Sequence, residues 1–503
     1  MKLSSSAWIV TCGWRVELLE PGRNCWRIER AQRAAIIVDA DQYFRLARKA
    51  MLEARHQLML IGWDFDTRIP LSRSSDDDAP TELGAFISWI ARRRPELQVH
   101  ILRWDFGTLK LLGRGSTVFR LGRWAASKNI TFKLDGAHPP AASHHQKIVV
   151  IDDRLALCGG IDMTAERWDT RTHRDNDDGR RRPTTHRRYG PWHDASMAVD
   201  GPAAQALGEL ARERWRCAGG KPIARPPTSS SHPWPAELKP LFKEVDVAIS
   251  RTRAAHGGLP AVREIEAIVC DQIRRARRFV YAENQYFASR AVAAAIMERI
   301  AEPEGPEFVI VNPMSGRGWL DDEAMSPARA RLVEEIRKAD RHGRFRIYSP
   351  VTEGREDIYV HSKIMIVDDQ IIRVGSANLN NRSMGLDSEC DLTIDTALAA
   401  NAKAGKAISA MLHDLLGEHL GVEPARVKRT MDRKGSLIAT VEALCGDGRS
   451  LVPLEIEQPS ALEKKLADNE VLDPESGGDD FEPIARPGLL AGLHWRSRRR
   501  QAA

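Results

Sequence analysis

The chain has 503 residues, of which 42% are hydrophobic, so it is long and apolar enough to bury a large core. A formal net charge of +6, from 75 Lys and Arg against 69 Asp and Glu, is too small to indicate a dedicated nucleic-acid-binding protein. The seven cysteines are scattered and include no C-x-x-C pair, which argues against a disulfide framework and against a cysteine-based zinc site.

The first half opens on a predicted helix that leads into apolar strands. The stretch DADQYFRLARKAMLEARHQ places apolar residues at helical spacing, and Asp39 or Asp41 can cap its start. LMLIGWDFD and LQVHILRW are then predicted to be buried strands. No apolar run reaches the ~20 residues of a membrane span, and residues 1–22 make a poor signal peptide. We expect a protein that is cytoplasmic or peripheral at a membrane surface; export without a cleavable signal stays open.

The second half repeats this order of elements. LPAVREIEAIVCDQIRRARR is again helix-periodic and runs into the strand-like stretches FVYAENQYF and EFVIVNP. The repeat predicts an α/β protein of two homologous layered halves, each a mixed central β-sheet flanked by helices, packed about a pseudo-twofold axis with one shared active site. We place the halves at residues 20–220 and 245–420, and a partly irregular extension at 421–503. The arginine-rich run from Arg167 to Arg188 falls outside the repeat and is predicted to be an exposed insertion.

Both halves contain the motif H-x-K-x-x-x-x-D, in HHQKIVVIDD (144–153) and in HSKIMIVDD (361–369). Side chains on a strand alternate between faces, so His145 and Lys147 point the same way, as do His361 and Lys363. A lone histidine on a strand is usually structural. Two motifs in register with a repeat of the whole half indicate a functional site instead.

Two His–Lys pairs that converge across a pseudo-twofold axis can cleave a phosphodiester without a metal or another cofactor. One imidazole attacks phosphorus, and the other protonates the leaving alcohol and later deprotonates the acceptor. The lysines would stabilise the charge that grows on the non-bridging oxygens. We assign phosphate binding to Asn378 and Ser376. A carboxylate is needed behind each imidazole, and the matched Asp194 and Glu389 are the candidates for orienting them.

Other polar residues stand at strand ends or turns. Asp152 and Asp368 complete the two motifs and so count among the catalytic candidates, but their position at hairpin turns favours a structural role. Trp63-Asp64 and Glu283-Asn284 end equivalent strands, where side chains often line a site. For these four residues the functional and structural interpretations both stay open.

At these residues the chain resembles the phospholipase D superfamily, whose hallmark is the duplicated H-x-K-x-x-x-x-D motif. IYVHSKIMIVDDQIIRVGSANLNNRSMGLDSE, YAENQYF, GGIDMTAERWD and PWHD carry the resemblance, which is strongest to the phosphatidylcholine-cleaving branch and to bacterial-type members without regulatory lipid-binding modules. The resemblance implies a phosphohistidine intermediate, with His145 as the nucleophile and His361 as the acid. Asp162 departs from it, because an asparagine there would mirror Asn378.

The resemblance implies a phospholipase D that releases phosphatidic acid and the free head group and that also transfers the phosphatidyl group to alcohols. A phosphatidyl transferase of the cardiolipin synthase type is the alternative, and a nuclease of the same superfamily is a weaker one. The expected partner is phospholipid at a membrane surface, with no nucleic acid, no metal and no cofactor. We expect a monomer.

Overall fold

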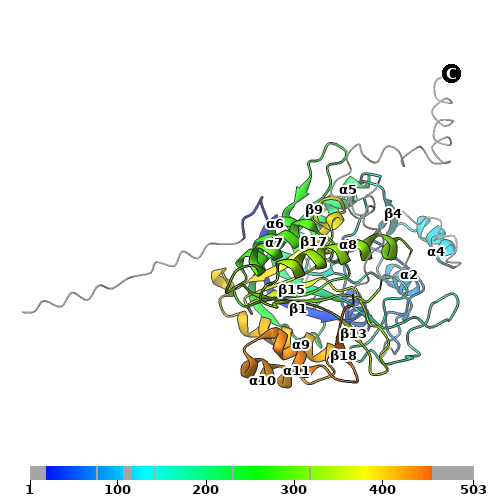
Figure 1. The fold of residues 1–503 in the computed structure, drawn as a ribbon. Coiled ribbons are helices and arrows are strands. Elements are labelled where there is room, and N and C mark those ends of the chain that lie inside the picture. Colours follow the sequence, from blue (N-terminus) through cyan, green and yellow to red (C-terminus); the bar gives the residue numbers. More distant parts are fainter. Residues whose placement is uncertain are drawn as a thin grey trace, which may run out of the picture.

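The computed structural model describes residues 19–74, 77–105, 116–140, 142–228, 232–315 and 319–455, and its ribbon is drawn in Figure 1. Most of the segment expected to be a poor signal peptide, and most of the predicted irregular extension, lie outside the described residues. No helix in the described part of the chain is long and apolar enough to cross a membrane.

The N-terminal half alternates strands and helices, as predicted. Its elements are β1 (Arg27–Val38), α1 (Ala40–Leu52), β2 (Gln57–Gly62), α2 (Leu83–Arg93), β3 (Gln98–Trp104), α4 (Ser116–Ala125), β4 (Ile130–Asp135), β5 (Ile148–Ile151), β6 (Leu155–Gly159), β7 (Trp192–His193), β8 (Ala195–Asp200) and α5 (Gly201–Cys217). The predicted helix from Asp39 is α1, and Asp39 is its N-cap residue, although its side chain makes no capping hydrogen bond.

The C-terminal half repeats this series. Its elements are β9 (Phe242–Arg253), β10 (Val262–Arg263), α6 (Glu264–Arg275), β11 (Phe279–Glu283), α7 (Arg290–Ile300), β12 (Glu307–Val311), α8 (Trp319–Ala339), β13 (Phe345–Val351), β14 (Tyr359–Val360), β15 (Ile364–Val367), β16 (Ile371–Gly375), a π-helical turn (Arg382–Leu386), β17 (Glu389–Asp395), a 3-10 turn (Ala399–Asn401) and α9 (Gly405–His419). Helices α10 (Pro424–Lys434) and α11 (Leu437–Leu444) and strand β18 (Ser450–Pro453) follow.

The two halves share one continuous mixed sheet. Its strand order is β18-β13-β12-β11-β15-β16-β17-β9-β1-β8-β6-β5-β2-β3-β4, with β10 paired to β9. The antiparallel pair of β1 and β9 lies at the centre of the sheet. Outward from this pair, the strands of the two halves follow in the same order, β8-β6-β5-β2-β3-β4 on one side and β17-β16-β15-β11-β12-β13 on the other, and β18 is added at one edge. The three outer strands of the repeat pair in parallel, β2, β3 and β4 in one half and β11, β12 and β13 in the other. The remaining pairs of the sheet are antiparallel. The predicted α/β class with duplicated halves is therefore confirmed, with the sheet running unbroken through both.

Helices cover both faces of the sheet (Figure 1). Helices α1 and α2 pack on the strands of the N-terminal half, and α6, α7 and α8 pack on those of the C-terminal half. Helices α5, α9, α10 and α11 join a core cluster that contains strand residues of both halves. In Figure 1 the orange helices α9, α10 and α11 lie on the opposite side of the sheet from the green α6, α7 and α8. This burial on two faces explains why the strands read as continuous apolar runs.

The extension after residue 420 is regular over part of its length. Helices α10 and α11 pack into the shared core, and β18 pairs antiparallel with β13 at the edge of the sheet. β18 is thereby the edge strand, and with four residues it is shorter than β13, as is common for edge strands.

Candidate active site

Each motif histidine makes a backbone hydrogen bond to the opposite half of the chain. We call the place where these bonds form, around His145 and His361, the seam between the halves. The backbone N–H of His145 donates to Ser388 O at 3.0 Å, and that of His361 donates to His193 O at 2.8 Å. Strand β7, which holds His193, pairs in parallel with β14, which ends one residue before His361. Each motif histidine is therefore tied by its backbone to the segment that precedes the orienting acid of the other half.

The side chains cross the seam in the same way. His145 Nδ1 lies 2.9 and 3.0 Å from the two carboxylate oxygens of Glu389, and His361 Nδ1 lies 2.7 Å from Asp194 Oδ2. The sequence selected these two acids but could not say which imidazole each one holds. In the structure each half supplies the acid for the other half's histidine. Because Nδ1 faces the acid in both rings, Nε2 is the nitrogen left for chemistry.

The residue directly after β6 or β16, Gly160 or Ser376, lies against the acid of its own half. At Gly160 a Cβ would lie 2.1 Å from Asp194 Oδ1, so only glycine leaves room for that carboxylate. The matched residue in the other half is Ser376, whose hydroxyl donates to Glu389 Oε2, while the Ser383 hydroxyl donates to Oε1 at 2.7 Å. Ser376 was expected to bind phosphate. Its proton is committed to Glu389, so we correct its role to positioning that acid.

The lysines differ between the halves. Both lysines donate to the carbonyl oxygen of their own motif histidine, Lys147 to His145 O and Lys363 to His361 O. Lys147 Nζ also lies 3.1 Å from Asp162 Oδ2, whereas Lys363 Nζ lies 3.5 Å from Gln285 Oε1. Asp162, the departure noted in the sequence, therefore neutralises one of the two lysines. Burial lowers the pKa of Lys363 to about 7, with Lys147 adding to the shift and Asp194 opposing it. Asn378, at the position matched to Asp162, is buried, and its amide oxygen makes no hydrogen bond within the described residues.

The imidazoles lie in a buried, positively charged environment. Burial, reinforced by Lys147 and Lys363, holds the pKa of His145 well below its ordinary value. The pKa of His361 is also held well below the ordinary value, by burial and then by Lys363 and Arg167. A neutral imidazole keeps a lone pair for attack on phosphorus. Burial raises the pKa of Glu389 to about 8, against the serine hydrogen bonds. Positive charge that develops on His145 would favour the ionised carboxylate.

An aromatic wall stands beside His361. The Trp192 ring centroid is 5.1 Å from that of His361 and 4.7 Å from that of Tyr359. The Arg167 guanidinium sits 4.2 Å from the centroid of Trp192. The sequence placed Arg167 in an exposed insertion and gave it no role near the motif. The structure brings its charge close enough to His361 to contribute to the lowered pKa.

Asp152 and Asp368 do not join the histidines. Each follows a strand at a tight hairpin turn in which both consecutive aspartates have positive φ, 51° and 54° at 152–153 and 53° and 57° at 368–369. The Asp368 carboxylate accepts hydrogen bonds from the backbone N–H groups of Arg277, Arg278 and Phe279, at 2.6 to 2.8 Å. Asp152 accepts from the three residues that lead into β2 in the same way. Both aspartates fix the start of a neighbouring strand, so we remove them from the catalytic candidates.

Asp368→Asn should therefore destabilise the fold and spare catalysis. The amide nitrogen cannot accept the hydrogen bond from Arg277, so we expect the free energy of unfolding to fall by about 1–3 kcal/mol. Asp369→Asn, which removes only an exposed pair with Arg278, should cost less than ~0.5 kcal/mol. Denaturant unfolding measures both. A kcat reduced ~100-fold in a stable Asp368→Asn protein would return this residue to the catalytic group.

The other strand-end residues hold structure. Asp64 receives hydrogen bonds from Arg103 at 2.9 Å and from Thr164 at 2.7 Å, and Trp63 stacks on Trp104. The Asn284 side chain accepts from the backbone N–H of Leu379 at 2.9 Å. Glu283 is fully buried and bonds to His193 and Ser362, among others. These contacts favour the structural interpretation over the functional one, both of which stayed open from the sequence.

Two family models match the chain, one in each half. The model described as "Phospholipase D" matches residues 50–231, and the one described as "Cardiolipin synthase, PLD-like domain" matches residues 269–411. The matched ranges contain both motifs, and each motif histidine is paired with an acid of the other half. The chain belongs to the phospholipase D superfamily.

Curated relatives agree with this membership. The chain is 24% identical over 492 residues to phospholipase D alpha 4 of Arabidopsis thaliana, covering 74% of this chain and 62% of the relative. It is 25% identical to phospholipase D alpha 1 of Carica papaya, covering 74% and 63%. Phospholipase D A of Dictyostelium discoideum is 24% identical, with 77% and 36% covered. The chain thus spans less than two thirds of the length of these superfamily members.

Solved structures with a similar chain path include the phosphatidylserine synthase of Haemophilus influenzae Rd KW20. It is 14% identical with a TM-score of 0.48, covering 76% of this chain and 89% of that one. The polyphosphate kinase of Porphyromonas gingivalis is 10% identical with a TM-score of 0.42, covering 76% and 50%.

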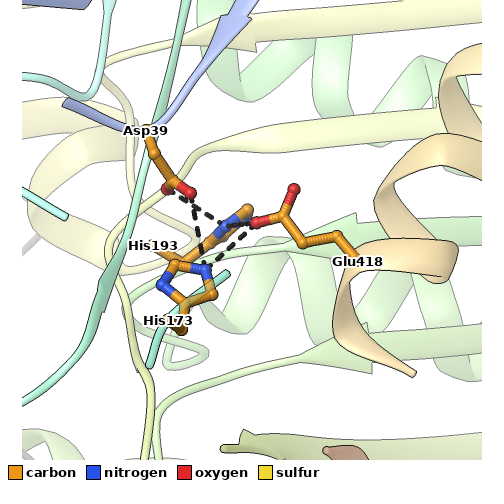
Figure 2. A group of neighbouring side chains, drawn as sticks. All are labelled: Asp39, His173, His193 and Glu418. Carbon is orange, nitrogen blue, oxygen red and sulfur yellow. Dashed lines mark hydrogen bonds and ion pairs between the residues drawn. The ribbon is translucent and has the colours of Figure 1, made fainter. Parts of the chain in front are cut away.

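Behind the candidate active site lies a group of buried polar residues that the sequence did not single out: Asp39, His173, His193 and Glu418 (Figure 2). Asp39 was noted only as a helix cap, and His193 appeared only within the stretch PWHD, without a role of its own. His173 belongs to the insertion that was expected to be exposed. That expectation was partly wrong. Asp169, His173 and Arg180 are buried, whereas residues 181–188 are largely exposed and exposed residues alternate with less exposed ones between 171 and 179.

Proposed function

We propose that the chain is a phospholipase D that cleaves the distal phosphodiester of glycerophospholipids through a phosphohistidine intermediate. The crossed pairing of His145 with Glu389 and of His361 with Asp194 is the observation that carries this proposal. Membership of the superfamily and matches to phospholipases D support it. Two imidazoles held at Nδ1 by separate acids can take different roles in one reaction.

The first step forms a bond between His145 Nε2 and phosphorus. The head-group oxygen leaves as its bond to phosphorus breaks, and it takes the proton from Nε2 of protonated His361. An anionic phosphodiester beside His361 favours the imidazolium, which offsets the lowered pKa of this ring in the free site. The Asp194 carboxylate stabilises the charge on that ring through Nδ1–H.

The second step reverses the proton transfer. His361, now neutral, takes a proton from water or an alcohol, whose oxygen attacks phosphorus and breaks the bond to His145. Water yields phosphatidic acid, and an alcohol yields a new phosphatidyl ester. The Lys363 ammonium would stabilise the non-bridging oxygens through both steps. A phosphatidyl transferase of the cardiolipin synthase type would use the same intermediate and differ in its acceptor, as the family model over residues 269–411 suggests.

The test is product analysis with competing acceptors. Phosphatidylcholine and phosphatidylethanolamine in detergent micelles, incubated with ethanol, should give phosphatidylethanol at the expense of phosphatidic acid, because both arise from one intermediate. Mass spectrometry identifies the products. A reaction that requires phosphatidylglycerol or glycerol as acceptor would favour the transferase. Degradation of DNA without turnover of any phospholipid would sink the lipid assignment.

Binding of an anion should depend on the protonation of Lys363. An anionic phosphodiester favours the ammonium, whose pKa in the free site is about 7, so affinity should be full below pH 7 and fall by up to ~10-fold per pH unit above it. Diethyl phosphate does not titrate in this range, so its inhibition constant from pH 5.5 to 9 measures the effect. Lys363→Arg, which stays charged, should flatten the curve. An unchanged pH dependence in that variant would assign the titration to another group.

A further inference from the structure

Two large apolar side chains are exposed in the described part of the chain, and they follow equivalent strands of the two halves. Phe119 is 80% exposed and lies near the start of α4, the helix after β3. Met314 is 38% exposed and lies just after β12. β3 and β12 occupy the same place in the strand order of their halves. One exposed apolar side chain is ordinary on a protein surface, whereas a matched pair points to a shared contact.

The strand register places both residues at the edge of the sheet where the motifs lie. β5 begins directly after Lys147, and its first residue pairs near the end of β2, which runs parallel to β3. β15 begins directly after Lys363, and its first residue pairs with Glu283 at the end of β11, which in turn pairs with the end of β12. Because each motif histidine meets an acid of the other half, the loops after β3 and β12 flank one site from two sides.

The inner face of α4 is fixed, which leaves Phe119 on the outer face. Thr117 and Trp124 are buried, and the Trp124 indole donates to Ser88 Oγ at 2.8 Å. Phe119 and Arg123 are four residues apart, so they share the opposite face, where both are exposed. In Figure 1 the cyan α4 stands at the periphery of the molecule. An aromatic ring and a cation on one exposed helical face suit the boundary between lipid head groups and acyl chains.

The loop that carries Met314 is held in place as well. Buried Asn312 donates from its side chain to the backbone oxygen of Asn284. Arg329 of α8 donates to the backbone oxygens of Pro313 and Met314, at 2.8 and 3.0 Å. These bonds fix the backbone of the loop, so the exposure of the thioether side chain is set by the fold.

A cationic stretch of the insertion borders the same side of the site. Residues 181–188 are largely exposed. Their four arginines have two acidic partners between them, Asp178 and Glu166, so the stretch keeps a positive excess: Arg181, Arg182, Arg187 and Arg188. Exposed ion pairs are weak and can exchange for lipid phosphates. Arg68 donates to Thr184 in this stretch, and the preceding Thr67 is bonded to the first turns of α4.

We propose that Phe119, Met314 and the arginines of residues 181–188 form a docking face for a bilayer that contains anionic phospholipid. This inference rests on the proposed function, because a lipid substrate must reach His145 and His361 from a membrane. The two apolar side chains would enter the boundary between head groups and acyl chains, and the arginines would bind lipid phosphates. Because the apolar residues flank the site, docking would turn its opening toward the head groups.

Vesicle binding by a chain that cannot consume the lipid tests the apolar part of the docking face. In the His145→Ala background, partition onto vesicles of phosphatidylcholine and phosphatidylserine in equal parts should fall ~10-fold with Phe119→Ser and ~3-fold with Met314→Ser. With His145 intact, Phe119→Ser should slow cleavage of vesicle lipid by a similar factor. It should leave cleavage of monomeric dibutyrylphosphatidylcholine unchanged, because that substrate needs no docking.

The cationic part is tested with a double variant. Arg187→Ala with Arg188→Ala should lower partition onto the same vesicles at least ~5-fold, and the loss should disappear on pure phosphatidylcholine. About 0.5 M salt should also remove this loss and spare the effect of Phe119→Ser. The matched control is Arg337→Ala with Lys338→Ala, an exposed cationic pair at the end of α8 away from the motifs, which should leave binding unchanged.

Hydrogen exchange locates the contact without any variant. Vesicles should slow amide exchange in residues 116–125 and 312–315 of the His145→Ala chain. Protection confined to other segments, or unchanged binding in both the Phe119→Ser and the double-arginine variants, would overturn the docking face. A dimer that light scattering detects and that Phe119→Ser abolishes, with vesicle binding intact, would identify a second copy as the occupant and also overturn it. Normal vesicle binding without cleavage of any phospholipid would count against the proposed function alone.

Discussion

His145→Ala and His361→Ala should each lower kcat by at least ~10³-fold and leave the chain folded. The first variant lacks the atom that bonds phosphorus, and the second lacks the acid for the leaving group. Both histidines lie at the seam and not in an apolar core, so truncation should cost little stability. Initial rates of phosphatidylcholine cleavage, with circular dichroism to check the fold, provide the measurement.

His256→Ala is the matched control for this pair. It removes an exposed histidine of the C-terminal half and should leave the rate unchanged. If either motif variant is folded and keeps more than about a tenth of the activity, the two-histidine mechanism does not hold.

Asp194→Asn and Glu389→Gln should each lower kcat by ~10²- to 10⁴-fold with little change in KM. Each amide nearly preserves the shape of the acid, but it removes the charge that holds the tautomer and stabilises the imidazolium. Because the pairing crosses the seam, Asp194→Asn should impair the half-reaction that depends on His361, although Asp194 belongs to the other half. Rates with a phosphatidyl ester of a good leaving group separate the two variants.

Such a substrate needs no acid in the first step. Asp194→Asn should therefore release the leaving group in a near-normal burst and then stall, whereas Glu389→Gln should slow the burst itself. Glu442→Gln, at an exposed glutamate that pairs with Arg346, is the control. Bursts that fail in Asp194→Asn and persist in Glu389→Gln would show that each acid serves the histidine of its own half.

The sequence predicted the duplicated architecture. It also selected His145, His361, Asp194 and Glu389, which form pairs between the two halves. The reason is physical, because a repeated strand pattern specifies a repeated fold. The prediction that each His–Lys pair stands on a strand was wrong, since both pairs lie just before β5 and β15. The continuity of the sheet was not predictable. It depends on the pairing of β1 with β9, and a strand's sequence does not say which strand of the other half it will pair with. The crossed pairing of acids and histidines had no sequence signal either, because it depends on how the halves dock.

The buried cluster was missed for the same reason. His173 and Glu418 are separated by 245 positions, so no short sequence pattern could reveal that they lie side by side. The insertion was predicted to be exposed because its many arginines are typical of a solvated segment. In the structure Arg180 is buried and pairs with Asp169. The sequence did draw attention to Asp39, but only as a candidate helix cap. Its carboxylate is instead turned into the core, with a backbone conformation that a capping aspartate does not need.

The covalent intermediate tests the shared site most directly. His361→Ala, mixed with a phosphatidyl ester that has a good leaving group and a ³²P-labelled phosphate, should retain the label after denaturation, because the variant lacks the base for the second step. Peptide mapping should place an acid-labile, alkali-stable phosphoryl group on His145, and His145→Ala should carry none. Label in the His145→Ala protein, or in neither protein, would contradict an attack by His145 assisted by His361.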